Sequence, residues 1–249
     1  MFEAFLPPAI EPIWAFALIA ISAGTSFVTA ALGLGGGVIL LAVMALIVPG
    51  HAIIPVHGAV QIGSNAGRAA IMLSHVQWSL FAPFLAGSIV GAALGGLTVV
   101  QLTPGVLKLA LGAFILWTAW GPPLGLKGRM ISLVTGAVSS FLTMFVGATG
   151  TFISAMVKTF NFGRMEHVAT HATCMVSQHV VKVLVFGFLG FHFAPYAGLI
   201  IAMIASGFLG TTLGKLVLLK SDDVKFHRVL SIILSLLAVK LLYDGLTAL

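Results

Sequence analysis

Four polar side chains lie at helical spacing inside one apolar stretch of the chain. They are His57, Gln61, Ser64 and Arg68, at positions i, i+4, i+7 and i+11, so a helix places them on one face. Ionisable side chains are costly inside a bilayer and usually face a cavity or a pathway. The spacing therefore predicts that this helix lines a polar site.

The cation on this face indicates an anionic ligand. The planar fork of Arg68 can hold two oxygens of one oxyanion, and no Asp or Glu lies close in sequence to pair with it. Imidazole titrates near neutral pH, so His57 could donate a hydrogen bond or carry a coupling proton. The alternatives are that Arg68 snorkels to the membrane interface and that His57 is a helix-packing group.

The second half of the chain repeats this face 114 positions later. In this register Gly33 falls on Gly147, Gly36 on Gly150, His57 on His171, Ser64 on Gln178, Asn65 on His179 and Arg68 on Lys182. Further on the register becomes 119, where GAALG at 91–95 falls on GTTLG at 210–214. We infer a gene duplication, with a first transmembrane repeat at residues 1–120, a linker at 121–129 and a second repeat at 130–249.

The repeat adds candidate ligands in the second half. Lys182 would be a second cation, with the same snorkelling alternative as Arg68, and His171 a second histidine. The amides and imidazole of Gln61, Asn65, Gln178 and His179 would complete a polar lining, although each alone is more often an interhelical hydrogen-bond partner.

A glycine-rich turn precedes each polar helix: GLGGG at 33–37 and GATGT at 147–151. Each is followed by a short apolar run, so it stands at a predicted helix start, where free N–H groups and the macrodipole favour an anion. The alternative is a hinge or a tight helix crossing. The predicted backbone and hydroxyl contacts to a substrate are Gly35, Gly36, Gly37, Thr149, Gly150 and Thr151.

The composition indicates an all-α polytopic membrane protein. Of the 249 residues 59% are hydrophobic and only 7% charged, against about 25% charged in soluble domains. Eight runs are long enough for spans of roughly 20 residues. They are Ile13 to Leu32, Pro55 to Leu73, Trp78 to Val100, Gly105 to Trp120, Met130 to Val146, Glu166 to Leu189, Ala194 to Leu219 and Phe226 to Leu246.

Two further runs, Val38 to Val48 and Phe152 to Phe160, are too short to cross comfortably and are predicted to be broken or re-entrant helices. If both cross, each half has five segments, the second half is inverted, and most Lys and Arg lie on one side. The positive-inside rule makes that side cytoplasmic. If both re-enter, each half has four crossings and charge segregates less well.

Other classes of function fit the sequence less well. His167, His171 and Cys174 on one helix could hold a soft or borderline divalent metal, which makes a metal transporter the alternative, but the first half does not repeat this set. No GxSxG, HExxH or paired-carboxylate arrangement suggests an enzyme, and no cofactor motif is present. The net charge of +6 is scattered rather than striped, which argues against nucleic acid. A structural or assembly role remains open.

The chain resembles the TauE/SafE family of membrane anion permeases, also described as sulfite exporters. The resemblance lies in GLGGGVILL, its echo GATGTFIS and the duplicated halves, over roughly Ile13 to Thr247. It implies a non-enzymatic permease in the bacterial inner membrane, with a small sulfur oxyanion as substrate: sulfite, thiosulfate or an organosulfonate. Alternating access between the halves is the expected mechanism. A homodimer is compatible with the sequence.

Overall fold

We analysed a computed structural model, which describes residues 6–32, 35–99, 103–120, 130–160, 162–217 and 223–248. Every regular element in these residues is a helix. The α-helices are α1 (Pro12–Leu32), α2 (Gly36–Ile47), α3 (Gly50–Ile71), α4 (Trp78–Val99), α5 (Pro104–Trp120), α6 (Ile131–Val146), α7 (Gly150–Lys158), α8 (Arg164–Phe188), α9 (Ala197–Val217) and α10 (Asp223–Leu246). Short 3₁₀ turns occupy Leu73–His75 and Ala194–Tyr196.

The all-helical prediction is confirmed for the described residues, and both short helices follow their glycine-rich turns. By length and apolar composition, three described segments could cross a membrane: Pro12–Ala31, Trp78–Thr98 and Ala194–Gly214. The larger number of spans stays a prediction.

One predicted boundary is wrong: α3 begins at Gly50, five residues before Pro55. The ring of Pro55 fixes a φ that a helix accepts, and its missing N–H removes one backbone hydrogen bond, so the helix continues through it.

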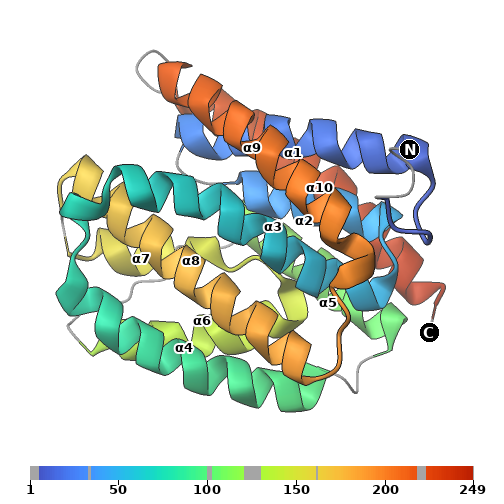
Figure 1. The fold of residues 1–249 in the computed structure, drawn as a ribbon, viewed down its shortest axis with the longest axis horizontal. Coiled ribbons are helices and arrows are strands. Elements are labelled where there is room, and N and C mark those ends of the chain that lie inside the picture. The colour runs from blue at the N-terminus through green and yellow to red at the C-terminus, as the bar shows by residue number, and fades with distance from the viewer. Residues whose placement is uncertain are drawn as a thin grey trace.

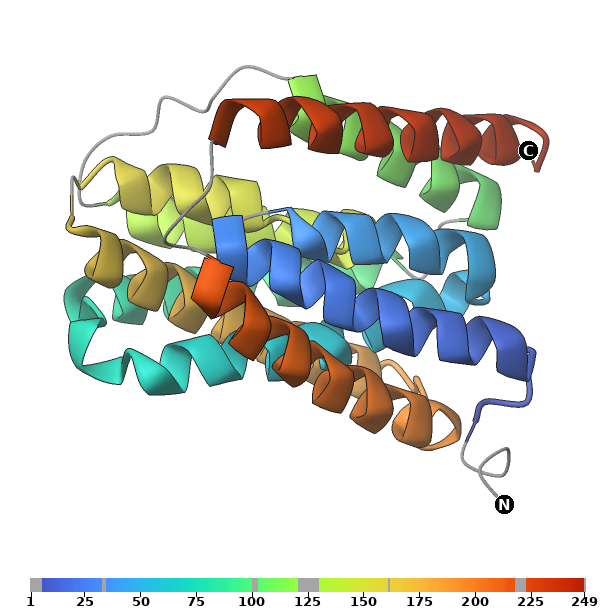
Figure 2. The ribbon, with the colours of Figure 1, turned by 90° about the horizontal axis from the view of Figure 1, so that it is seen from above.

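The helices lie roughly side by side and pack in pairs (Figure 1). In the centre α3 packs on α8, with α1 on α9 and α4 on α6 beside them, while α5 and α10 lie together at one edge (Figure 2). The short helix α2 lies inside the bundle, where Leu41 and Met44 are completely buried. The two short helices therefore begin within the packed interior, next to the polar faces of α3 and α8.

Glycines bring the flanking helices close together. A Cβ at Gly91 of α4 would collide with the carbonyl oxygen of Ala137 in α6, and one at Gly210 of α9 with that of Ala23 in α1. Small residues allow such close helix contacts. Ala23 and Ala137 are 114 positions apart and Gly91 and Gly210 are 119 apart. The two registers found in the sequence therefore meet in equivalent contacts.

Candidate functional site

A pocket of about 40 Å³ lies where α2 and α7 begin. On a scale where one water takes at least 10–15 Å³, this is room for about three waters or one small ion. Residues from both halves of the chain line it. They are Thr29, Gly35, Gly37, Val38, His57, Gln61, Asn65, Arg68, Ala148, Gly150, His171, Met175 and His179.

The polar face of α3 carries a hydrogen-bonded row from Gln61 to Arg68 along the pocket, with His57 bonded to α2 beside it. His57 Nε2 donates to the carbonyl of Gly37 at 2.9 Å, and the amide nitrogen of Gln61 lies 3.3 Å from the same ring atom. Asn65 Nδ2 donates to the backbone carbonyl of Gln61 at 2.8 Å, and Arg68 Nη2 donates to Asn65 Oδ1 at 2.6 Å. Because a guanidinium carries five N–H donors, Arg68 is held in position with donors left for a ligand.

The second half contributes two histidines. His171 Nε2 donates to the carbonyl of Gly150 at 3.1 Å, as His57 does to Gly37. His179 is completely buried, and neither of its ring nitrogens has a hydrogen-bond partner among the described residues. Its ring centroid lies 6.0 Å from that of His57. Buried polar atoms normally have a partner, so His179 indicates a place for water or a ligand.

The helix starts at the pocket leave backbone donors uncapped. The N-cap residues are Gly35 for α2, which has no side chain to cap with, and Thr149 for α7, whose hydroxyl makes no cap hydrogen bond in the described structure. Gly35 has a φ of 98°, a left-handed conformation that favours glycine. First-turn N–H groups and the positive end of each helix dipole therefore lie beside the pocket.

The two buried cations occupy different places. Arg68 lines the pocket with 6% of its surface exposed, whereas Lys182 is 0% exposed and lies outside it. Lys182 Nζ donates to the Gly147 carbonyl at 2.9 Å and to Thr143 Oγ1 at 3.5 Å. The snorkelling alternative is therefore wrong for both side chains. Among the lining residues none is Asp or Glu, so no carboxylate of the described chain lines the pocket with Arg68.

The structure brings most of the predicted contact residues together at the pocket. Those that line it are Gly35, Gly37, His57, Gln61, Asn65, Arg68, Gly150, His171 and His179. Gly36 instead packs against the backbone of Thr25 in α1.

Three further predicted contacts lie outside the lining. Thr149 and Gln178 bond each other at 3.0 Å, and Lys182 lies behind the pocket. The side chain of Thr151 is outside the described structure.

Sequence reasoning missed four lining residues: Thr29, Val38, Ala148 and Met175. Met175 is the position 114 residues after Gln61, so the repeat contained a signal for it. The others are a threonine near the end of α1 and small or apolar residues beside the glycines. Residue type gave no signal for these three.

The metal alternative is not supported by the described residues. No group of three or more His, Cys, Asp or Glu in them could hold a metal ion, so His167, His171 and Cys174 form no such site. Cys174 lies in an apolar cluster with Phe84 and Ile153. The expected helical spacing was correct, but the thiol faces the neighbouring core instead of the histidines.

Comparison with known proteins gave one family. The model of the family described as sulfite exporter TauE/SafE matches residues 16–241. No curated protein and no solved structure matched the chain. Since the match covers most of the sequence, the chain belongs to the sulfite exporter TauE/SafE family of membrane transporters.

Proposed function

We propose that the protein is a secondary transporter that moves a small sulfur-containing oxyanion across the bacterial inner membrane. The observation that carries this proposal is a pocket lined by Arg68 and by two uncapped helix starts, with no carboxylate among the described residues of its lining. A fixed cation and oriented N–H groups can replace the hydration of an anion within the membrane. Family membership narrows the class to sulfur anions such as sulfite.

The size of the pocket supports a small substrate. Its volume of about 40 Å³ suits sulfite or thiosulfate, and a short organosulfonate would need the pocket to widen. Arg68 would hold two oxygens of the anion, and the unpartnered ring of His179 would bond a third. Gln61 and Asn65 hold the row in place rather than carry charge.

We further propose that the two repeats are inverted copies. Ser26 of α1 bonds Ser64 of α3 at 3.2 Å, and their partners 114 positions later, Ser140 and Gln178, also bond at 3.2 Å. Together with the matching glycine contacts, this supports a duplication at residues 1–120 and 130–249. Alternating access would follow if the halves exchange conformations around the pocket.

Uptake of radiolabelled sulfite into proteoliposomes tests the function. We expect saturable flux that unlabelled sulfite and thiosulfate inhibit, that an organosulfonate inhibits less and that a divalent metal leaves unchanged. Arg68→Ala should abolish the flux, and Arg68→Lys, which retains the charge but loses the planar fork, should retain part of it. Flux equal to wild type in Arg68→Ala would contradict the proposal.

Proton coupling is a finer proposal that rests on the paired histidines. His57 and His171 each donate to a carbonyl in the first turn of a short helix, so a change of protonation at either would act where substrate binds. The pH dependence of sulfite flux in His57→Ala and His171→Ala measures this. Unchanged pH dependence in both variants would contradict coupling through these residues.

A homodimer stays a prediction. Cross-linking in native membranes followed by mass measurement would test it, and a single mass of one chain would argue against it.

A further inference from the structure

At two pairs of positions 114 residues apart, the residue of the second half is polar and more exposed than its apolar partner in the first half. Ser154 and His167 in the second half are partly exposed, whereas their partners 114 positions earlier, Leu40 and Ile53, are each 1% exposed. The inverted arrangement would place these partners at opposite ends of the pocket. The two ends of the pocket therefore differ both in polarity and in burial.

The polar side is built from α7 and the start of α8. Ser154 Oγ lies 3.3 Å from His167 Nε2, and the His167 ring stacks on that of His171 with centroids 6.5 Å apart. His171 lines the pocket, so His167 lies one helical turn outside it. Lys158 at the end of α7 is exposed. Hydroxyl, imidazole and ammonium groups thus lead from the surface to the pocket.

The carboxylate of Glu166, at the start of α8, is already bonded. Glu166 Oε1 accepts a hydrogen bond from Gln77 Nε2 at 3.1 Å, and Oε2 accepts one from the Gly163 N–H at 3.1 Å. These bonds tie the carboxylate to the α3–α4 turn and to the start of α8. It is therefore held at the rim instead of across the polar groups that lead inwards.

The opposite side is closed by packed aliphatic side chains. Leu40 and Met44 of α2 and Ile53 and Ile54 of α3 are all 2% exposed or less and belong to the main core. Met44 is the register partner of Lys158, which extends the contrast to a third pair. An anion passing this layer would lose its hydration with no replacement, which is costly for a charge.

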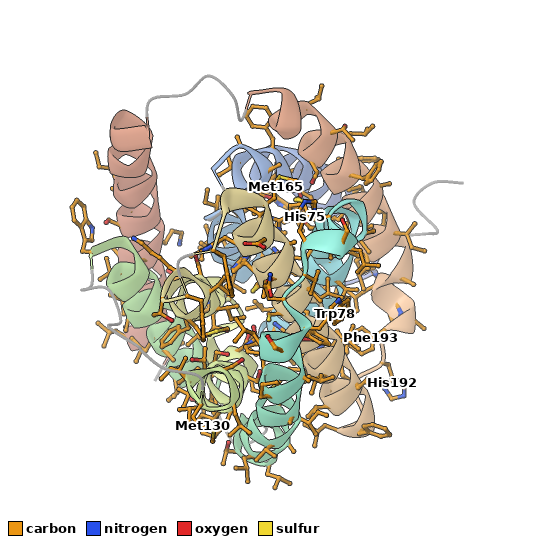
Figure 3. All side chains as sticks on the ribbon, turned by 90° about the vertical axis from the view of Figure 1, so that its left-hand side faces the viewer. His75, Trp78, Met130, Met165, His192 and Phe193 are labelled. Carbon is orange, nitrogen blue, oxygen red and sulfur yellow. The ribbon has the colours of Figure 1, made fainter. Side chains whose placement is uncertain are left out.

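We propose that the anion reaches the pocket past Ser154 and His167, at the end of the bundle where α7 finishes and α8 starts, while Leu40 and Ile53 seal the opposite end. This rests on the proposed function. Figure 3 looks onto the accessible end, with His75, Trp78 and Met165 labelled. His167 is then a residue of the access route. Its counterpart in the first half is Ile53, so the sealed end has no histidine at this position.

Cysteine labelling tests the route, because the chain has one native cysteine, the buried Cys174. In a Cys174→Ala background we would make Ser154→Cys and His167→Cys, with Leu40→Cys and Ile53→Cys as matched controls from the same register. A membrane-impermeant, anionic thiosulfonate reagent is applied to inverted membrane vesicles and to right-side-out vesicles. Labelling after denaturation confirms that every thiol is present.

We expect the two route positions to react at least about tenfold faster than the two controls, since only exposed thiols react readily. Reaction should occur from the cytoplasmic face, and sulfite should slow it. Equal rates at all four positions, or faster reaction at residues 40 and 53, would overturn the proposal. The proposal would also be overturned if the Ser154→Cys or His167→Cys variant still took up sulfite while sulfite failed to slow the labelling of its thiol.

The proposed function and the proposed access route are tested independently. If wild-type protein shows no sulfite uptake, transport of sulfite is wrong, and the relative labelling rates of the four positions still decide the access route. A double variant, Ser154→Leu with His167→Ile, copies the sealed end. We expect this variant to fold, because Leu and Ile are the residues that pack at the equivalent positions 40 and 53. A cysteine placed at Met175 in the pocket should then be labelled at least about tenfold more slowly than in the protein with Ser154 and His167.

Discussion

The polar faces of α3 and α8 begin with equivalent residues but make different contacts. On α3 the bonds run along the helix itself, from Gln61 to Asn65 to Arg68. On α8 they cross to a neighbouring helix, where Gln178 Nε2 donates to Ser139 Oγ of α6 at 2.9 Å. Lys182 likewise bonds outwards, to the carbonyl that ends α6.

This difference separates Arg68, the proposed substrate contact, from Gln178 and Lys182, which bond to α6 and its C-terminal end. Bonds within α3 leave its outer surface free, so Arg68 lines the pocket. Bonds between α8 and α6 consume the donors of Gln178 and Lys182 and fix the turn before α7. A cation can thus occupy the same place in the register and either line the pocket, as Arg68 does, or support the backbone beside it, as Lys182 does.

The largest expected effect is on the two glycines that begin the short helices. A Cβ at Gly36 would collide with the backbone oxygen of Thr25, whereas one at Gly150 would make ordinary contacts, with Met175 at 3.4 Å and His171 Nε2 at 3.7 Å. Gly36→Ala should therefore cost more than about 3 kcal/mol of stability, the upper end for overpacking, and Gly150→Ala less than about 1. Thermal unfolding in detergent measures both, and equal losses would contradict the asymmetry.

The next effect separates binding from turnover. We expect Arg68→Met to weaken sulfite binding about 100-fold, because it removes a buried charged donor. Lys182→Met, which lies outside the pocket, should change binding in this conformation by less than about threefold. Sulfite flux through Lys182→Met should still fall. If the two inverted halves exchange conformations, as proposed, Lys182 takes the place of Arg68 at the pocket in the other conformation. Calorimetric binding and vesicle flux compare the two, and equal loss of binding would remove the distinction.

Sequence spacing predicted the polar face of α3 well. The period of the helix alone brings His57, Gln61 and Arg68 to one side, and all three line the pocket. The fourth residue, Ser64, bonds Ser26 of α1 instead. Periodicity fixes which residues share a face, but which part of the face meets a neighbouring helix depends on packing.

The 114-residue repeat predicted which residues occupy equivalent positions better than it predicted which neighbours they contact. It pairs Lys182 with Arg68, but the space that Lys182 occupies exists because Gly58 of α3 has no side chain there. It pairs Gly36 with Gly150, yet only Gly36 is required for close approach to α1. Two halves of similar sequence also predict two similar ends of the pocket. The sequence already shows that Ser154 and His167 replace Leu40 and Ile53 in the register. Their exposure follows from tertiary packing, which no local pattern contains.

A smaller effect is expected at Gly58, whose register partner is Ala172. A Cβ at Gly58 would lie 2.7 Å from Cε of Lys182, a flexible side chain that can move. Gly58→Ala should therefore displace Lys182 from the Gly147 carbonyl and cost about 1 kcal/mol, at the low end for overpacking. Sulfite flux should fall less than in Lys182→Met. Gly67→Ala is the matched control, since its Cβ would meet Phe208 at 3.5 Å, and a larger loss there would contradict the assignment.

The smallest effect is expected for a cation that lies in neither face. Lys240 of α10 bonds Asp244 at 3.0 Å, and 56% of its side chain is exposed. Exposed pairs of this kind contribute about 0–1 kcal/mol, so Lys240→Ala should leave the unfolding midpoint nearly unchanged. Sulfite flux should also stay at the wild-type level at physiological ionic strength, because exposed charges are screened within about 8 Å. If flux fell as far as in Arg68→Met, the anion would be responding to the overall positive charge of the protein, and the distinction between the two helix faces would lose its basis.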